Sequence, residues 1–141
     1  MTWHTGRLID HVHLRARDFP ATRRFYEKVL AVLGVPLSAT GDGWLQADEL
    51  FIDRADAGAV ASHVHLAFQA KDRETVEAFY EAALAAGGID NGAPGERDYH
   101  PGYYACFVLD PEGNNIEAVF HGAAHRSVDS VEISPIDEPQ D

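Results

Sequence analysis

The tetrapeptide His-Val-His-Leu occurs twice in the chain, at His11–Leu14 and at His63–Leu66, 52 residues apart. Each copy is followed by an aspartate, Asp18 or Asp72, and then by Phe-Tyr-Glu. A repeat at this period indicates that one supersecondary unit is used twice. Because histidine is the commonest metal ligand in proteins and titrates near neutral pH, the duplicated histidines are the first candidates for chemistry.

The first pair of histidines lies on a predicted strand. Residues Ile9–Arg15 alternate, so that His11 and His13 share one face and Val12 and Leu14 share the other. We therefore expect the apolar pair to pack on a helix and the histidines to point away from it, into a cavity.

The elements that must position these residues follow the same order in both halves. Asp18 and Asp72 each offer a helix cap. The first half is predicted to contain a strand, a helix and three short strands, at residues 9–15, 22–33, 36–39, 44–47 and 49–53. The second half is predicted to repeat this order at residues 62–70, 72–86, 91–97, 103–109 and 114–121, where 91–97 is a loop with at most a short strand.

One such half would leave a sheet face unburied, which explains why two occur together. The sequence therefore predicts an α+β fold in which two tandem β-α-β-β-β modules form a curved mixed sheet around a concave cavity, with helices on the outer faces. We expect a single domain at residues 1–122, with modules at about 8–53 and 62–121. Residues 123–141 form an acidic extension without a helical or strand period, predicted to be loosely held.

The composition excludes several classes of protein. The net charge of −12 argues against a nucleic-acid partner, which requires a basic surface. No stretch of about 18 apolar residues suggests a membrane span, and the N-terminus lacks the apolar segment of a signal peptide, so we expect a cytoplasmic protein. The single cysteine, Cys106, lies in an apolar segment and is interpreted as a core residue, not a nucleophile.

The end of the second half carries the most specific motif. Residues 110–117 read Asp-Pro-Glu-Gly-Asn-Asn-Ile-Glu. Together with the doubled module and a histidine at the start of each half, this motif resembles the vicinal oxygen chelate superfamily of glyoxalases, bleomycin resistance proteins and extradiol dioxygenases. The resemblance covers roughly residues 8–122, and Tyr99–Ala105 resembles a glyoxalase-like subgroup.

The resemblance implies a divalent metal ion held by the first strand of each half and by the last strand. Matched by position, the ligands would be His11, His63 and Glu117. Two imidazoles and one carboxylate suit a catalytic ion such as Fe²⁺, Mn²⁺, Zn²⁺ or Ni²⁺ with open positions. The alternatives are histidines hydrogen-bonded to backbone and a Glu117 that pairs with an arginine.

Some superfamily members use a fourth carboxylate from the last strand of the first half. Glu49 or Asp53 could supply it here, unless Phe51 occupies the equivalent position. In that case the site would have three ligands, as in extradiol dioxygenases.

Other residues are candidates for the cavity and its mouth. The residues expected to line a substrate pocket are His13, His65, Trp44, Glu49 and Phe51. The residues expected to act in acid–base chemistry or substrate orientation are His100, Tyr103 and Tyr104. Core packing is the alternative for Trp44 and Phe51, and aromatic packing of a loop for the second group. For His13 and His65 the alternatives are support of a metal ligand and, in another register, direct binding of the metal. His4, His121 and His125 are assigned no role.

The sequence supports two candidate functions, which belong to different classes of protein. The first is a metal-dependent lyase, isomerase or dioxygenase that chelates two adjacent oxygens of a small-molecule substrate. The second is a metal-free binding protein of the bleomycin-resistance kind, which would hold an aromatic or cationic small molecule. Members of the superfamily often pair or swap halves, so the resemblance also implies a homodimer.

Overall fold

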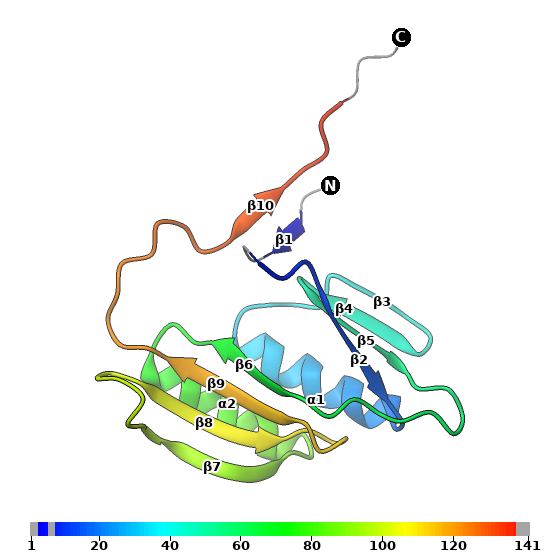
Figure 1. The fold of residues 1–141 in the computed structure, drawn as a ribbon, viewed down its shortest axis with the longest axis horizontal. Coiled ribbons are helices and arrows are strands. Elements are labelled where there is room, and N and C mark those ends of the chain that lie inside the picture. The colour runs from blue at the N-terminus through cyan, green and yellow to red at the C-terminus, as the bar shows by residue number, and fades with distance from the viewer. Residues whose placement is uncertain (1–2, 6–7, 138–141) are drawn as a thin grey trace.

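The computed structural model of the protein describes residues 3–5 and 8–137, shown in Figure 1. The first module contains β2 (Val12–Ala16), α1 (Phe19–Val32), β3 (Ala39–Gly41), β4 (Trp44–Ala47) and β5 (Leu50–Arg54). The second contains β6 (His65–Gln69), α2 (Arg73–Ala85), β7 (Ile89–Glu96), β8 (Tyr104–Leu109) and β9 (Asn115–Phe120). Both modules therefore have the predicted β-α-β-β-β order.

Each module has its own four-stranded mixed sheet. The strand order is β2-β5-β4-β3 in the first sheet and β6-β9-β8-β7 in the second. In both, the first strand of the module is parallel to the last, and the other neighbours are antiparallel. No hydrogen-bonded strand pair joins the two sheets among the described residues. The α+β prediction is confirmed, in the form of two sheets that each carry a helix.

The predicted helix caps are confirmed. The Asp18 carboxylate accepts a hydrogen bond from the Ala21 N–H at 3.1 Å, and Asp72 accepts one from the Thr75 N–H at 2.7 Å. These bonds satisfy backbone donors that a helix leaves open in its first turn. Neither helix is long and apolar enough to cross a membrane, which holds for every helix in the described part of the chain.

The two helices join the modules through a shared core. α1 packs against α2, and the largest fully buried side chains include Phe25 and Tyr26 from α1 and Phe79 from α2. Leu45 and Ile52 of the first sheet and Ile116 of the second belong to the same core. A loss of packing in one module would therefore also destabilise the other.

Strand alternation gives each sheet a second, open face that turns away from its helix. In β4 and β5 the buried residues Leu45 and Ile52 alternate with the half-buried Trp44, Phe51 and Asp53. In β6 the core-packed Leu66 and Phe68 alternate with exposed residues, including His65. As predicted, His13 of β2 and His65 of β6 lie on the side away from the core, and His11 and His63 are exposed just before these strands.

The turn between β8 and β9 is built on the buried carboxylate of Asp110. Its Oδ1 accepts hydrogen bonds from the N–H groups of Glu112 and Asn114. Its Oδ2 accepts them from the Tyr26 hydroxyl at 2.6 Å and the Asn114 side-chain amide at 2.8 Å. The Asn114 side-chain oxygen in turn accepts the Val64 N–H at 2.9 Å. One turn thus connects α1, the start of β6 and the start of β9.

Burial is the main reason that the pKa of the Tyr26 hydroxyl lies well above its ordinary value, and the neighbouring Asp110 carboxylate raises it further. The hydroxyl is therefore protonated and remains a hydrogen-bond donor at every physiological pH.

The strand β7 differs from the loop predicted at residues 91–97. It runs through Ile89–Glu96 and pairs with β8, but its register shifts between Asp90 and Gly92 and again between Gly92 and Gly95. Gly92 has a φ of 149°, in the region that favours glycine. These irregularities interrupt the alternation of side chains, which is why the sequence shows no strand period there.

The acidic extension also contains an element that the sequence analysis does not predict. β10 (Val131–Ile133) pairs antiparallel with β1 (Trp3–Thr5), and this ribbon projects away from the two sheets (Figure 1). The prediction of an extension without strands is therefore wrong at this point. Strands of three residues are too short to show a period, and their partners lie at opposite ends of the chain.

Replacement of Asn114 by alanine tests the role of the turn. The variant removes one of the two donors to Oδ2 of the buried Asp110 carboxylate and leaves the Val64 N–H without its partner, so we expect it to lower the free energy of unfolding by about 2–4 kcal/mol in urea denaturation. Asn115→Ala is the matched control, because the Asn115 side chain, among the residues that the structure describes, accepts a hydrogen bond only from the exposed Asn91. Equal effects of the two substitutions would contradict a special role for the turn.

Candidate functional site

A buried carboxylate on the open face of the second sheet is the centre of the candidate site. Glu117 is 2% exposed, and its Oε1 lies 2.9 Å from the His65 Nε2. Its Oε2 accepts a short hydrogen bond from the Tyr103 hydroxyl. Burial of a carboxylate is costly unless it is paired, and here both oxygens have partners.

The strand register brings these three residues together. In the parallel pair of β6 and β9, Glu117 lies opposite Ala67, so His65 reaches it from the position two residues earlier on the same face. On the other side Glu117 lies opposite Phe107 of β8, whose ring centroid is 5.9 Å from that of His65. An aromatic side chain therefore flanks the contact between His65 and Glu117.

The environment of Tyr103 holds its hydroxyl in the protonated form. Desolvation is the largest cause, followed by the hydrogen bond and the charge of Glu117, and together they raise its pKa to about 12. Tyr103 is therefore a donor to Glu117 and is not available as a base near neutral pH.

Two histidines support Tyr103 from the loop side. The His100 Nε2 lies 2.8 Å from the His121 Nδ1, and both rings contact the Tyr103 ring edge-on. The His100 Nδ1 faces the Pro101 carbonyl at 2.9 Å, and a carbonyl can only accept, so this nitrogen carries a hydrogen. In the neutral pair the His100 Nε2 is then the acceptor and the His121 Nδ1 the donor. His121, to which the sequence analysis assigns no role, thus belongs to this cluster.

The predicted ligand set is not brought together as expected. Glu117 meets His65, whereas His63 is exposed and precedes β6. The His11 ring lies against Asp10 at 2.7 Å, on the first module. In residues 3–5 and 8–137, no group of three or more histidine, cysteine, aspartate or glutamate side chains could hold a metal ion.

The choice between His63 and His65 follows from the helix caps and not from the tetrapeptide. His11 precedes its helix-capping Asp18 by seven residues, and in the second module the residue seven before Asp72 is His65. The tetrapeptide repeat is offset from this alignment by two residues. Because side chains on a strand alternate, an offset of two preserves the face and changes only the position along the strand. The spacing to the aspartate is the signal that distinguishes the two histidines.

The same alignment assigns an equivalent to Glu117 in the first module. Ala67, opposite Glu117, precedes Asp72 by five residues, and His13, opposite Phe51, precedes its own capping aspartate by five. Phe51 therefore occupies the position of Glu117, one of the two alternatives that the sequence left open.

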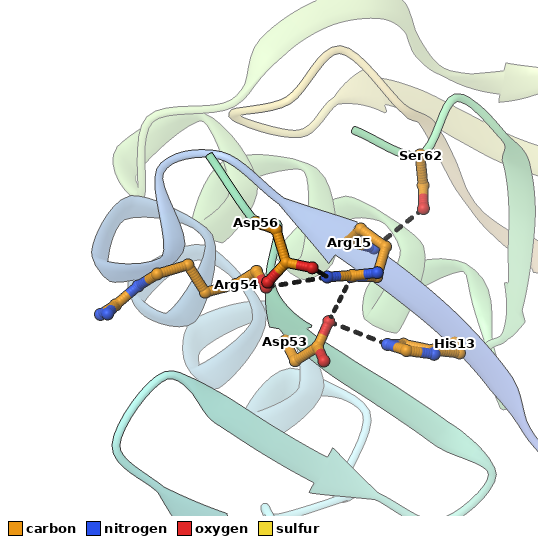
Figure 2. A network of polar contacts seen from close by, with 6 residues as sticks. All are labelled: His13, Arg15, Asp53, Arg54, Asp56 and Ser62. Atoms are coloured by element: carbon orange, nitrogen blue, oxygen red, sulfur yellow. Dashed lines mark hydrogen bonds and ion pairs between the residues drawn. The ribbon is translucent and has the colours of Figure 1, made fainter. Parts of the chain in front are cut away.

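The carboxylate of Asp53 is already engaged on the open face of the first sheet. Figure 2 shows that His13 and Arg15 both approach it. Its Oδ1 accepts a hydrogen bond from the His13 Nε2 at 2.8 Å and lies 2.8 Å from the Arg15 Nε, an ion pair poorly aligned for a hydrogen bond. Arg15 also contacts Asp56 at 3.6 Å. The other candidate for a fourth ligand, Glu49, lies before β5, and its backbone carbonyl accepts the Val12 N–H.

The remaining predicted residues separate into two groups. Trp44 and Phe51 lie close together on the first open face, with ring centroids 6.0 Å apart. Tyr104 is buried on the opposite face of the second sheet from Tyr103, and its hydroxyl donates to Glu77 of α2 at 2.8 Å. Tyr104 therefore does not lie beside the Tyr103 hydroxyl, because adjacent residues on a strand point to opposite faces.

Comparisons with known proteins agree with this architecture. The model of the Glyoxalase/Bleomycin resistance protein/Dioxygenase superfamily matches residues 8–118. A glyoxalase/bleomycin resistance protein from Albidiferax ferrireducens T118 is 27% identical, with a TM-score of 0.69, over 80% of this chain and 98% of that chain. A family enzyme from Burkholderia phytofirmans PsJN is 24% identical, with a TM-score of 0.62, over 78% and 95%.

A lactoylglutathione lyase from Agrobacterium tumefaciens is 21% identical, with a TM-score of 0.55, over 82% of this chain and 94% of that chain. At this identity the likeness concerns the fold alone. A search of curated proteins gives no significant match.

The alkaline titration of Tyr103 tests the environment of Glu117. We expect its ¹³Cζ resonance to titrate with a midpoint near pH 12, and Glu117→Gln to lower the midpoint because it removes the negative charge. The folded state binds this proton more tightly than the unfolded chain, so the tyrosine's contribution to stability is complete below pH 10 and is lost as the pH rises toward 12. Glu96→Gln, at an exposed carboxylate, is the control. An unchanged midpoint in Glu117→Gln would contradict the assigned contact.

Proposed function

We propose that this chain, which belongs to the glyoxalase/bleomycin resistance protein/dioxygenase superfamily, is a metal-dependent enzyme that acts on a small molecule with two adjacent oxygen atoms. The observation that carries the proposal is the buried Glu117 carboxylate held 2.9 Å from the His65 imidazole on an open sheet face. Imidazole and carboxylate are the ligands expected for a catalytic divalent ion with open positions. The reaction would be that of a lyase, an isomerase or a dioxygenase.

A single chain supplies part of the ligand set that such an ion requires. His65 and Glu117 fit it, because the carboxylate is fixed by burial and the histidine is 53% exposed in its side chain and can turn to an ion. The third ligand would be His11 of a second copy, since His11 lies on the other module and has the same spacing to its helix cap as His65. We therefore propose a homodimer in which the open faces of different copies meet.

When bound, the ion would act as a Lewis acid on the substrate oxygens. The chain's own residues would position and tune it. Tyr103 donates to Oε2 of Glu117 and leaves Oε1 as the oxygen directed at a ligand. The Phe107 ring beside His65 would limit the access of water to this oxygen.

The types of ligand limit the choice of metal but do not identify a single ion. Two imidazoles and a carboxylate suit Fe²⁺, Mn²⁺, Zn²⁺ and Ni²⁺, and the first-row affinity order does not decide between them when availability differs.

The second candidate function is that of a metal-free small-molecule binding protein. The stacked rings of Trp44 and Phe51 on the first open face favour it, since they offer an aromatic surface for a ligand. This function would need no contribution from His65 or Glu117, which separates it from the first.

Metal uptake by single variants tests the proposed ligands. We expect each wild-type chain to bind one metal ion, which is Fe²⁺, Mn²⁺, Zn²⁺ or Ni²⁺, in equilibrium dialysis with elemental analysis. The variants His65→Ala and Glu117→Ala should each weaken this binding at least about a hundredfold. His63→Ala is the matched control, because it removes the neighbouring imidazole of the same face. Circular dichroism identifies any variant that fails to fold. A loss that follows His63 and spares His65 would contradict the assignment.

A mixing experiment tests the proposed dimer. His11→Ala and Glu117→Ala chains each lack a ligand, and co-refolded heterodimers would regain one intact site per dimer if His11 acts across the interface. Binding of half the wild-type amount of metal is therefore expected in the heterodimer and none in either parent. If no wild-type chain takes up metal, the enzyme proposal fails and the binding-protein function is favoured.

A further inference from the structure

A shallow, open pocket of about 480 Å³ lies on the open face of the first sheet, on the module that does not carry Glu117. Its walls include Trp44, Gln46, Phe51, Asp53 and Arg54. These residues come from the neighbouring antiparallel strands β4 and β5, in which Trp44 lies directly opposite Asp53. An aromatic surface and a carboxylate therefore meet in one pocket.

The two rings that form the aromatic surface are stacked on one another. The rings of Trp44 and Phe51 are inclined by only 28°, and the His13 ring meets Phe51 edge-on at 5.0 Å. Gly41 lies opposite Trp44 on β3, and a Cβ there would be 2.0 Å from the indole Nε1. The absence of a side chain at Gly41 thus lets the indole lie along the sheet.

The carboxylate at the edge of this surface is held in place and keeps one oxygen unengaged. Oδ1 of Asp53 takes both the His13 and the Arg15 contacts shown in Figure 2. Oδ2 has no partner among the described residues. An oriented acceptor beside an aromatic surface matches a ring that carries an O–H or N–H donor.

We propose that the first open face is a binding site for a planar aromatic ring bearing a hydrogen-bond donor, such as a phenol or an arylamine. The ring would lie on Trp44 and Phe51, and its donor would bond to Asp53. That this ring belongs to the substrate of the metal centre rests on the proposed function, whereas the binding itself does not.

The test uses 2-naphthol, which has a single oxygen and cannot chelate a metal as a vicinal pair would. Binding to the full chain is measured in EDTA by the ¹H–¹⁵N cross-peak of the Trp44 indole, identified with Trp44→Leu. We expect saturable binding of 2-naphthol. Decahydro-2-naphthol, the saturated analogue, should bind at least about fivefold more weakly because it has no aromatic face. 2-Methoxynaphthalene, which lacks the donor, should be weaker by about threefold or more.

Three variants connect these differences to the named residues. Gly41→Val keeps the indole but displaces it, so it should weaken 2-naphthol binding about as much as Trp44→Leu does. Binding to Trp44→Leu is measured by calorimetry, because this variant has no Trp44 indole signal. Asp53→Ala should abolish the preference for 2-naphthol over its methyl ether and leave ring binding in place. Val60→Ala, at a residue 82% exposed on the connector between the modules, is the control.

Equal affinity for the aromatic and saturated compounds, or unchanged binding in Trp44→Leu, would overturn the proposal. So would a preference for the naphthol that survives in Asp53→Ala. Because metal is absent throughout, these outcomes are independent of metal uptake, and a failure of the metal centre would leave this site unaffected.

Discussion

The register of β6 against β9 is the constraint on which the second sheet depends. His63 and His65 lie on one face of the chain, so a slip of two residues would keep that face and present a different imidazole to Glu117. Asn114 removes this freedom, because its side-chain oxygen accepts the Val64 N–H while its amide is anchored in the buried turn. A parallel pair fixed at one end by a side chain has one register, and here that register selects His65.

Glu117 and His65, the pair that this register brings together, differ in their exposure. Glu117 is almost inaccessible and has donors on both oxygens, whereas His65 has more than half of its side chain exposed. An unpaired carboxylate at this depth would cost several kcal/mol, so Tyr103 stabilises the site whenever His65 moves. The raised pKa of Tyr103 keeps it a donor throughout the physiological range. The carboxylate is thus the fixed element of the site and the imidazole the adjustable one.

The sequence predicts the modules, the caps and the faces well, because each has a local cause. A capping aspartate and the alternation of His13 with Leu14 are visible within a few residues. The tetrapeptide predicts His63 as the ligand, whereas the spacing to the capping aspartate, which is also a local signal, indicates His65, the residue that the structure brings to Glu117. The contact itself depends on the strand register, which distant residues set. The sequence does not predict β7 as a regular strand, because its bulges break the alternation. It does not predict the ribbon of β1 with β10 either, because these short strands lie at opposite ends of the chain.

Duplication by itself would give two similar faces, yet these two differ at the position that matters. Phe51 stands where the second module has Glu117, and its cross-strand partner is His13 in place of an alanine. A carboxylate at position 51 would face the carboxylate of Asp53 on the same strand face, and like charges there repel. Phenylalanine removes that repulsion and extends the surface of Trp44. The exchange of one residue at a paired position therefore gives one sheet face an aromatic ring where the other has a buried carboxylate, on the same scaffold.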